Sequence, residues 1–176
     1  ECERAMVRGL VDALKATHDP SASERARAWL ARAVQRAWRA AGPCVIACCG
    51  RSGTGKSTVA AALAAATGFP LLSSDVFRKA QAGIPLGERA PAAMYTPRAR
   101  ANVYDALARA TAAAITDSPG VIVDATCLHR VDRDTLRAAA AERGAPIVFL
   151  ECRAPAATVR RRLSRRKGSP SDATWA

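Results

Sequence analysis

Apolar and polar positions divide most of the chain into two kinds of segment that alternate. Short apolar runs have the length of buried strands, at 44–49, 69–73, 121–124 and 146–152. Ala-rich stretches between and after them are long enough for helices, at 56–67, 97–116, 131–143 and 154–166. Strands that alternate with helices form parallel sheets with helices on both faces. The pattern therefore predicts an α/β fold, a three-layer αβα arrangement around a parallel sheet.

The first forty residues follow a different pattern, which predicts two helices at 5–16 and 22–41. The polar residues Ser21 and Ser23 are candidates to cap the second helix. Leu30, Val34 and Trp38 recur at helical spacing and predict a packing face. Gly42-Pro43 ends this pattern, so we expect an N-terminal helical segment or linker at 1–42 and the main domain at 43–176.

Length and composition place the chain among globular domains. It has 176 residues, of which 49% are hydrophobic and 24% are charged. The longest apolar runs are far shorter than the roughly 20 residues of a membrane span. No secretory leader is recognisable, so a cytoplasmic location and no membrane partner are expected. The six cysteines include no C-x-x-C pair, which argues against a zinc site.

The formal net charge of +12 raises the question of a nucleic-acid partner. More than half of that surplus lies in 153–167, which holds seven basic residues and no acid. Aromatic residues that could stack on bases make up only 5% of the chain. A nucleic-acid partner therefore stays a less favoured alternative.

One motif carries specific chemistry. The segment 50–57 reads GRSGTGKS and matches G-x-x-x-x-G-K-[ST] between a predicted strand and a predicted helix, as a phosphate-binding P-loop requires. Its backbone N–H groups and the helix N-terminus would surround phosphate oxygens. Lys56 would reach the β- and γ-phosphates, Ser57 would bind Mg²⁺ and Thr58 would contact an inner phosphate. The expected ATP-binding residues are Gly50, Arg51, Ser52, Gly53, Thr54, Gly55, Lys56, Ser57 and Thr58.

The rest of the chain narrows the class of P-loop protein. No N-K-x-D sequence for reading guanine occurs, and the D-x-x-G match at 117–120 precedes its strand instead of following it. The residues after Pro43 leave little room for the second helical domain of a ring-forming ATPase. A compact phosphotransferase fits best.

Two carboxylates follow strand candidates. Asp124 ends one strand and is a candidate to hold the hydrated Mg²⁺, although it could simply cap the next turn. Asp75 ends another and is a candidate to orient and deprotonate an acceptor hydroxyl. Arg78, three residues later, would bind substrate or pair with Asp75. The alternative for Asp75 is an N-cap of a helix that begins at Val76.

The basic run at 160–167 predicts a helix on which Arg162 and Arg166 share one face and Arg161 and Arg165 share another, and the spacing does not decide which arginine points inward. It follows the fourth strand candidate, where a lid could close guanidinium groups over the transferring phosphate. A solvated basic helix is the alternative. His129 follows Asp124 closely enough to line the site, but a surface or loop position is favoured.

These motifs together resemble a known family. The P-loop, Ser73-Ser74-Asp75 with Arg78-Lys79, Asp124-Ala125-Thr126 and Ala154-Pro155 before the arginines are similar to the P-loop kinases called AAA-type ATP-binding domain or predicted kinase. These are related to polynucleotide kinase, gluconate kinase and zeta toxin. The resemblance implies strand order 2-3-1-4-5, ATP as donor and a hydroxyl acceptor near Asp75.

The family comparison also carries implications for the two ends of the chain. Family members often follow an aminoglycoside-phosphotransferase-like domain, and Glu3-Arg4-Ala5-Met6-Val7-Arg8 resembles its last helix. Members continue through another helix and strand, which implies that domain 43–176 is truncated at its C-terminus.

The leading hypothesis is an ATP-dependent kinase for a small hydroxyl-bearing molecule. The alternatives are a polynucleotide 5′-hydroxyl kinase and a non-catalytic ATP-sensing module of a larger fusion protein.

Overall fold

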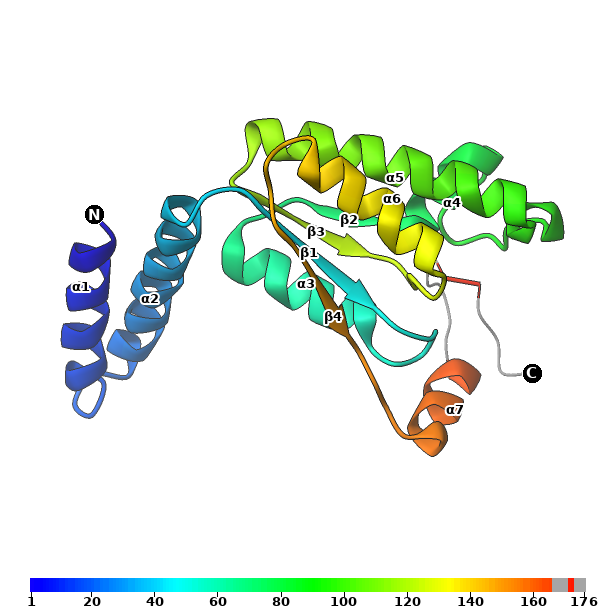
Figure 1. Ribbon diagram of the computed structural model, residues 1–176. Helices are drawn as coiled ribbons and strands as arrows, with labels where there is room; N and C mark the ends of the chain where they lie inside the picture. The colour runs from blue at the N-terminus through cyan, green and yellow to red at the C-terminus, as the bar shows by residue number, and fades with distance from the viewer. Residues whose placement is uncertain (166–170, 173–176) are drawn as a thin grey trace.

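The computed structural model describes residues 1–165 and 171–172, and the strands in this part of the chain form one parallel sheet (Figure 1). The strands are β1 (Cys44–Cys49), β2 (Leu71–Ser73), β3 (Gly120–Asp124) and β4 (Ile147–Glu151). Their order is β2-β3-β1-β4, and every neighbouring pair is parallel. The predicted α/β class is confirmed, and the order agrees with the first four strands of the order implied by the family.

Helices cover both faces of the sheet (Figure 1). On one face lie α5 (Pro97–Asp117) and α6 (Arg130–Ala141), and α3 (Lys56–Thr67) lies on the other. β3 is buried along its whole length because it has a strand on each side and helices on both faces. Its Val121 and Val123 pack in the α5–α6 core with Leu107, whereas Ile122 packs in the α3 core. This alternation explains why β3 is an unbroken apolar run in the sequence.

Shorter elements gather beyond the carboxyl ends of the strands. These are α4 (Ser74–Ala82), the 3₁₀ turn η1 (Ala92–Tyr95) and α7 (Ala156–Ser164). Most predicted boundaries lie within about two residues of the observed ones. The strand predicted from residue 69 begins at Leu71, while Phe69 is buried against the α3 core. The part of the last predicted helix beyond residue 165 lies outside the described residues.

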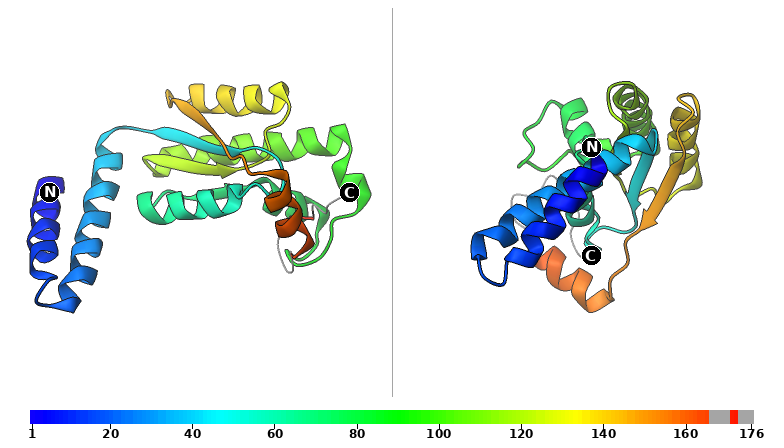
Figure 2. Two further views of the ribbon diagram at one scale, coloured as in Figure 1. Left: turned by 90° about the horizontal axis from the view of Figure 1, so that it is seen from below. Right: turned by 90° about the vertical axis from the view of Figure 1, so that its left-hand side faces the viewer.

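The N-terminal helical segment is a hairpin of α1 (Cys2–Lys15) and α2 (Pro20–Ala40), which extends away from the sheet (Figure 2). Small residues form the contact between the helices, since Ala5, Ala22 and Ala26 are buried there. The predicted packing face is only partly present: Leu30 lies against Gly9 of α1, 3.0 Å from where a Cβ of that glycine would be, but it is still 44% exposed, as is Val34. The small residues, Gly9 included, allow close approach of the two helices.

The hairpin meets the main domain where α2 ends. Trp38 packs edge-on against Phe69, with ring centroids 6.0 Å apart. The predicted cap of α2 is also wrong, because Asp19 takes that position and accepts a hydrogen bond from the Ser21 N–H at 2.9 Å. The division into segments 1–42 and 43–176 stays a prediction. None of the described helices is long and apolar enough to cross a bilayer.

Candidate functional site

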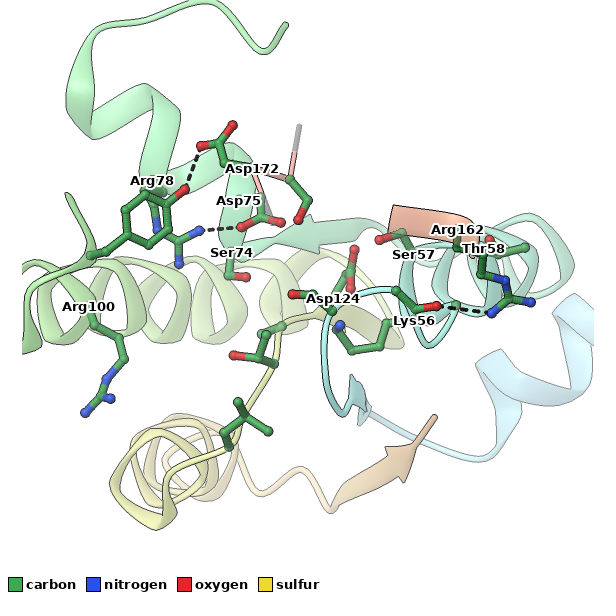
Figure 3. A pocket seen from close by; sticks show the side chains of 18 of the residues that line it. Lys56, Ser57, Thr58, Ser74, Asp75, Arg78, Arg100, Asp124, Arg162 and Asp172 are labelled. Atoms are coloured by element: carbon green, nitrogen blue, oxygen red, sulfur yellow. Dashed lines mark hydrogen bonds and ion pairs between the residues drawn. The ribbon is translucent and has the colours of Figure 1, made fainter. Parts of the chain in front are cut away.

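A pocket of about 990 Å³ opens beyond the carboxyl ends of the central strands (Figure 3). This edge is where open parallel sheets bind their ligands. The P-loop and the start of α3 line one half of the pocket, which we call the nucleotide half. The other half, which we call the acceptor half, is lined by α4, the 84–96 loop and the segment 171–172. Residues 124–129 and α7 complete the wall.

The P-loop conformation depends on its glycines. Gly50, Gly53 and Gly55 have φ angles of 119°, 81° and 103°, in the region that favours glycine. A Cβ at Gly50 would lie 2.5 Å from the carbonyl oxygen of Cys152, so no side chain fits. The Gly50 N–H also donates to the Thr126 carbonyl at 3.0 Å, which ties the loop to the chain after β3.

The start of α3 is suited to an anion. Lys56 is the first helical residue and is 8% exposed, and its Nζ donates to the carbonyl oxygen of Arg51 at 2.9 Å. Gly55 at the N-cap has no side chain to satisfy the first helical N–H groups. Ser57 and Thr58 are exposed and line the pocket. Backbone donors, an ammonium group and two hydroxyls therefore face one space.

Asp124 reaches the same half of the pocket from β3. Its Cα is paired in register with that of Cys48, two residues before the P-loop, and the residue is 8% exposed. Tyr104 supports the turn that follows, because its hydroxyl accepts from the Cys127 N–H at 2.9 Å. The pocket thus receives a carboxylate beside Lys56 and Ser57, as the strand-end position predicted (Figure 3).

In the acceptor half, α4 presents Asp75 and Arg78 to the pocket as an ion pair. Their side chains are 29% and 13% exposed. The N-cap alternative for Asp75 is wrong: α4 begins at Ser74 with Ser73 as the N-cap residue, so Asp75 lies inside the first turn. Of the two roles expected for Arg78, pairing with Asp75 is present. The Arg78 guanidinium also lies over the Tyr95 ring, 4.9 Å from its centroid.

Sequence reasoning missed a buried ion pair beside the acceptor half. Lys79 is 1% exposed, and its Nζ lies 3.1 Å from Oδ1 of Asp172. The Lys79 Nζ also donates to the carbonyl oxygens of Leu86, at 2.8 Å, and Glu88. The available signal was that Asp172 is the only acid after Glu151 in a strongly basic stretch. Nothing in the sequence, however, pointed to its partner.

Helix α7 packs against the P-loop and supplies several arginines. Arg162 Nη1 donates to the carbonyl oxygen of Gly53 at 3.3 Å, and Val159 and Leu163 surround the same glycine. Arg161, Arg162 and Arg165 line the pocket. Arg166, which was expected to share a helix face with Arg162, lies outside the described residues. The lid role of these arginines stays a prediction.

Further basic groups line the acceptor half. Arg89 and His129 are both exposed pocket residues. Arg100 also lines the pocket, and its Nε lies 3.4 Å from Oδ1 of the buried Asp132. His129 was expected either to line the site or to lie on the surface. It does both, because it is an exposed residue at the start of α6 and also lines the pocket.

The cysteines near the pocket are structural. Burial raises the pKa of Cys48 to about 11 and that of Cys127 to about 12, so both thiols stay protonated at neutral pH. Among residues 1–165 and 171–172, no group of three or more His, Cys, Asp or Glu side chains is placed to hold a metal ion.

Comparison with known proteins agrees with this geometry. A family model described as AAA domain (AAA_33) matches residues 45–176. A sugar kinase from a Janibacter species is similar in structure, with 27% identity and a TM-score of 0.54 over 75% of this chain and 72% of that protein. A gluconokinase from Sinorhizobium meliloti has 28% identity and a TM-score of 0.52, over 72% and 66% of the two chains.

A more distant structure shows the same fold. An APS kinase from Mycobacterium tuberculosis, solved in complex with AMPPNP and APS, has 20% identity and a TM-score of 0.53 over 70% of each chain. No curated protein sequence matches the chain.

Proposed function

Because the chain belongs to the AAA domain family, we propose that it is an ATP-dependent phosphotransferase that moves the γ-phosphoryl group of ATP to a hydroxyl of a small molecule. One observation carries the proposal. The P-loop and the Asp75–Arg78 pair open into a single pocket, so a donor phosphate and an acceptor can meet there. The sugar kinase and gluconokinase that resemble this chain support the same class of reaction.

In the nucleotide half, the amides of residues 50–58 would hold the phosphates of ATP, and Lys56 would contact the β- and γ-phosphates. Ser57 and Asp124 fit a Mg²⁺ ion, because a hydroxyl and a carboxylate are the oxygen donors it prefers. Two protein ligands suffice, since Mg²⁺ usually keeps several waters and binds substrate phosphates. The bound ion would neutralise part of the phosphate charge.

In the acceptor half, Asp75 would orient the acceptor hydroxyl and take its proton, while Arg78 holds the carboxylate in place. The hydroxyl oxygen would bond to the γ-phosphorus as the bond to the β-phosphate oxygen breaks, and ADP would leave. Arg162 and Arg166 would stabilise the charge on the transferring group from α7 and its C-terminal side. No covalent enzyme intermediate is needed.

The charge of the acceptor half favours an acceptor that carries an anionic group. Arg78, Arg89 and Arg100 line it, and Arg89 has no acidic partner among the described residues. A carboxylate or phosphate on the acceptor would bind such guanidinium groups. A sugar acid therefore fits this half better than a polycationic aminoglycoside.

A polynucleotide 5′-hydroxyl kinase is the second candidate. The exposed Arg160 and Arg161 on α7, and Arg165 directly after it, support it, since they could contact a phosphate backbone next to the pocket. Binding through such contacts would weaken steeply as salt rises.

A transfer assay with labelled ATP and Mg²⁺ tests these functions together. The acceptor panel contains neutral sugars, sugar acids, aminoglycosides and 5′-hydroxyl oligonucleotides, and Lys56→Ala is the inactive control. Transfer to a sugar acid is the expected result. Transfer to oligonucleotides alone would favour the second candidate, and ATP binding without any transfer would favour the ATP-sensing module instead.

A further inference from the structure

The segment Ser171-Asp172 lies against the acceptor half, although it is distant in sequence from the other residues there. We propose that Asp172 is a positioning residue that anchors the 84–96 loop and Tyr95 and so shapes the acceptor half of the pocket. The inference rests on the proposed function only in taking the ligand of this half to be the phosphate acceptor. The contacts of Asp172 with the loop are independent of that function.

Asp172 joins three parts of the acceptor half. Its Oδ2 accepts from the Tyr95 hydroxyl at 2.6 Å and from the Ala90 N–H at 2.9 Å, and its Oδ1 lies 3.1 Å from Nζ of Lys79. Lys79 in turn donates to the carbonyls of Leu86 and Glu88. One carboxylate and one ammonium group therefore fix both the backbone and the aromatic side chain of the loop.

These contacts continue to the candidate base. The Tyr95 ring, held by its hydroxyl, lies 4.9 Å from the Arg78 guanidinium, and Arg78 forms the ion pair with Asp75. If Tyr95 moved, the Arg78 guanidinium would lose the aromatic ring that packs against it. Asp172 can therefore influence the position of Asp75 through Tyr95 and Arg78 (Figure 3).

Burial of the Lys79–Asp172 pair explains why the 84–96 loop prefers a single arrangement. The side chains of Lys79 and Asp172 are only 1% and 9% exposed, and a buried charge is strongly unfavourable without its partner. Burial and the hydrogen bond to Asp172 raise the pKa of Tyr95 to about 12, so its hydroxyl remains a donor at neutral pH. The loop thus has one strongly preferred arrangement when Asp172 is in place.

Two measurements on the full chain test the proposal. The first is hydrogen exchange of the backbone amides of the 84–96 loop, measured on the protein without ligands. The second is steady-state kinetics with the acceptor identified by the transfer screen, which gives the KM for the acceptor and for ATP. In Asp172→Asn, we expect loop exchange to accelerate about tenfold and the acceptor KM to rise about tenfold, with the KM for ATP unchanged. Asp172→Glu, which keeps the charge, should recover part of both effects.

Tyr95→Phe separates positioning from general stability. It removes the hydroxyl contact but keeps the buried Lys79–Asp172 pair and the ring over Arg78. We expect a several-fold rise in acceptor KM with a nearly unchanged melting temperature. The matched control is Asp134→Asn, which removes an exposed carboxylate that pairs with Arg137 on α6. Asp134→Asn should change neither the hydrogen exchange of the 84–96 loop nor the acceptor KM.

Each outcome decides the proposal. Wild-type acceptor KM values in both Asp172→Asn and Tyr95→Phe would overturn it, and so would unchanged loop exchange in Asp172→Asn. If Asp172→Asn does not fold, the acceptor KM of Tyr95→Phe decides alone. If the wild-type chain phosphorylates no acceptor, the proposed function fails, and the exchange experiment still decides whether Asp172 anchors the loop.

Discussion

Arg162 donates a hydrogen bond to the carbonyl oxygen of Gly53 at 3.3 Å, and so connects α7 to the P-loop across 109 positions of sequence. The contact places a guanidinium group at the loop whose amides would hold the phosphates of ATP. A lid arginine in this position could stabilise charge on the transferring phosphoryl group. The position of α7 and the conformation of the P-loop are therefore linked.

Replacing Arg162 tests this link. In Arg162→Ala we expect kcat to fall by about 10- to 1,000-fold, because a charge-stabilising donor near the γ-phosphate is lost. Arg160→Ala is the matched control, since Arg160 lies on the same helix but does not line the pocket. The measurement is phosphate transfer at saturating ATP. Equal turnover in both variants would contradict the role of Arg162.

Removing the Lys56 ammonium group should abolish transfer and leave the fold intact. Lys56→Ala loses a buried charge that folds back on the carbonyl of Arg51, so we expect weaker ATP binding and turnover reduced by about 100-fold or more. Calorimetric titration with ATP and Mg²⁺, together with a melting curve, checks both points. Turnover close to that of the wild type would remove Lys56 from the mechanism.

Asp75→Asn should separate binding from chemistry. The amide keeps the shape of the side chain but cannot accept the hydroxyl proton, so transfer should fall by about 100- to 10,000-fold. ATP affinity should stay nearly unchanged, because Asp75 lies in the acceptor half. The two quantities are measured by calorimetry and by labelled phosphate transfer. Undiminished transfer would show that Asp75 is not the base.

Gly50→Ala should destabilise the protein through a steric clash. Its Cβ would lie 2.5 Å from the Cys152 carbonyl oxygen, and its φ of 119° is itself unfavourable for alanine. Gly144→Ala is a matched control, because Gly144 also has a positive φ of 62° but has no atom within 4 Å of an added Cβ. Thermal unfolding should show a clearly larger loss of melting temperature for Gly50→Ala.

The contribution of Asp172 to stability should depend on pH. Burial raises its pKa, but the hydrogen bonds from Tyr95, Ala90 and Lys79 outweigh this and lower it below the ordinary value of 3.8. A carboxylate with a depressed pKa in the folded state stabilises the protein fully above its unfolded pKa, and this contribution is lost as pH falls through the folded pKa. The difference in stability between wild type and Asp172→Asn should therefore be constant near neutral pH and shrink below about pH 4. Urea unfolding at several pH values measures it, and a difference that grew on acidification would contradict the assignment.

The sequence was most informative where local rules apply. The apolar run of β1, the glycines and Lys56 of the P-loop, and Asp124 at the end of β3 each depend on neighbours close in sequence or on simple strand geometry. These features were predictable for that reason. Arg78 was placed correctly as well, because three residues of helix bring it beside Asp75.

Features that depend on long-range contacts were not predictable. The Lys79–Asp172 pair joins residues whose proximity arises only from the folded chain, and a lone acid in a basic stretch gives no indication of its partner. The hairpin contact failed for a related reason. Helical spacing identified Leu30 and Val34, but the residues buried between the helices are the small Ala22 and Ala26, and Leu30 lies against Gly9 while remaining 44% exposed.

The late position of Asp172 has a consequence for synthesis on the ribosome. The P-loop, Lys56 and Asp124 all precede it, so a nascent chain can assemble the sheet and its phosphate cradle before residue 172 has left the exit tunnel. The loop that Asp172 anchors would then lack its ionic partner. A ribosome-bound intermediate of this protein would therefore acquire the ability to hold a nucleotide earlier than the ability to select what is phosphorylated.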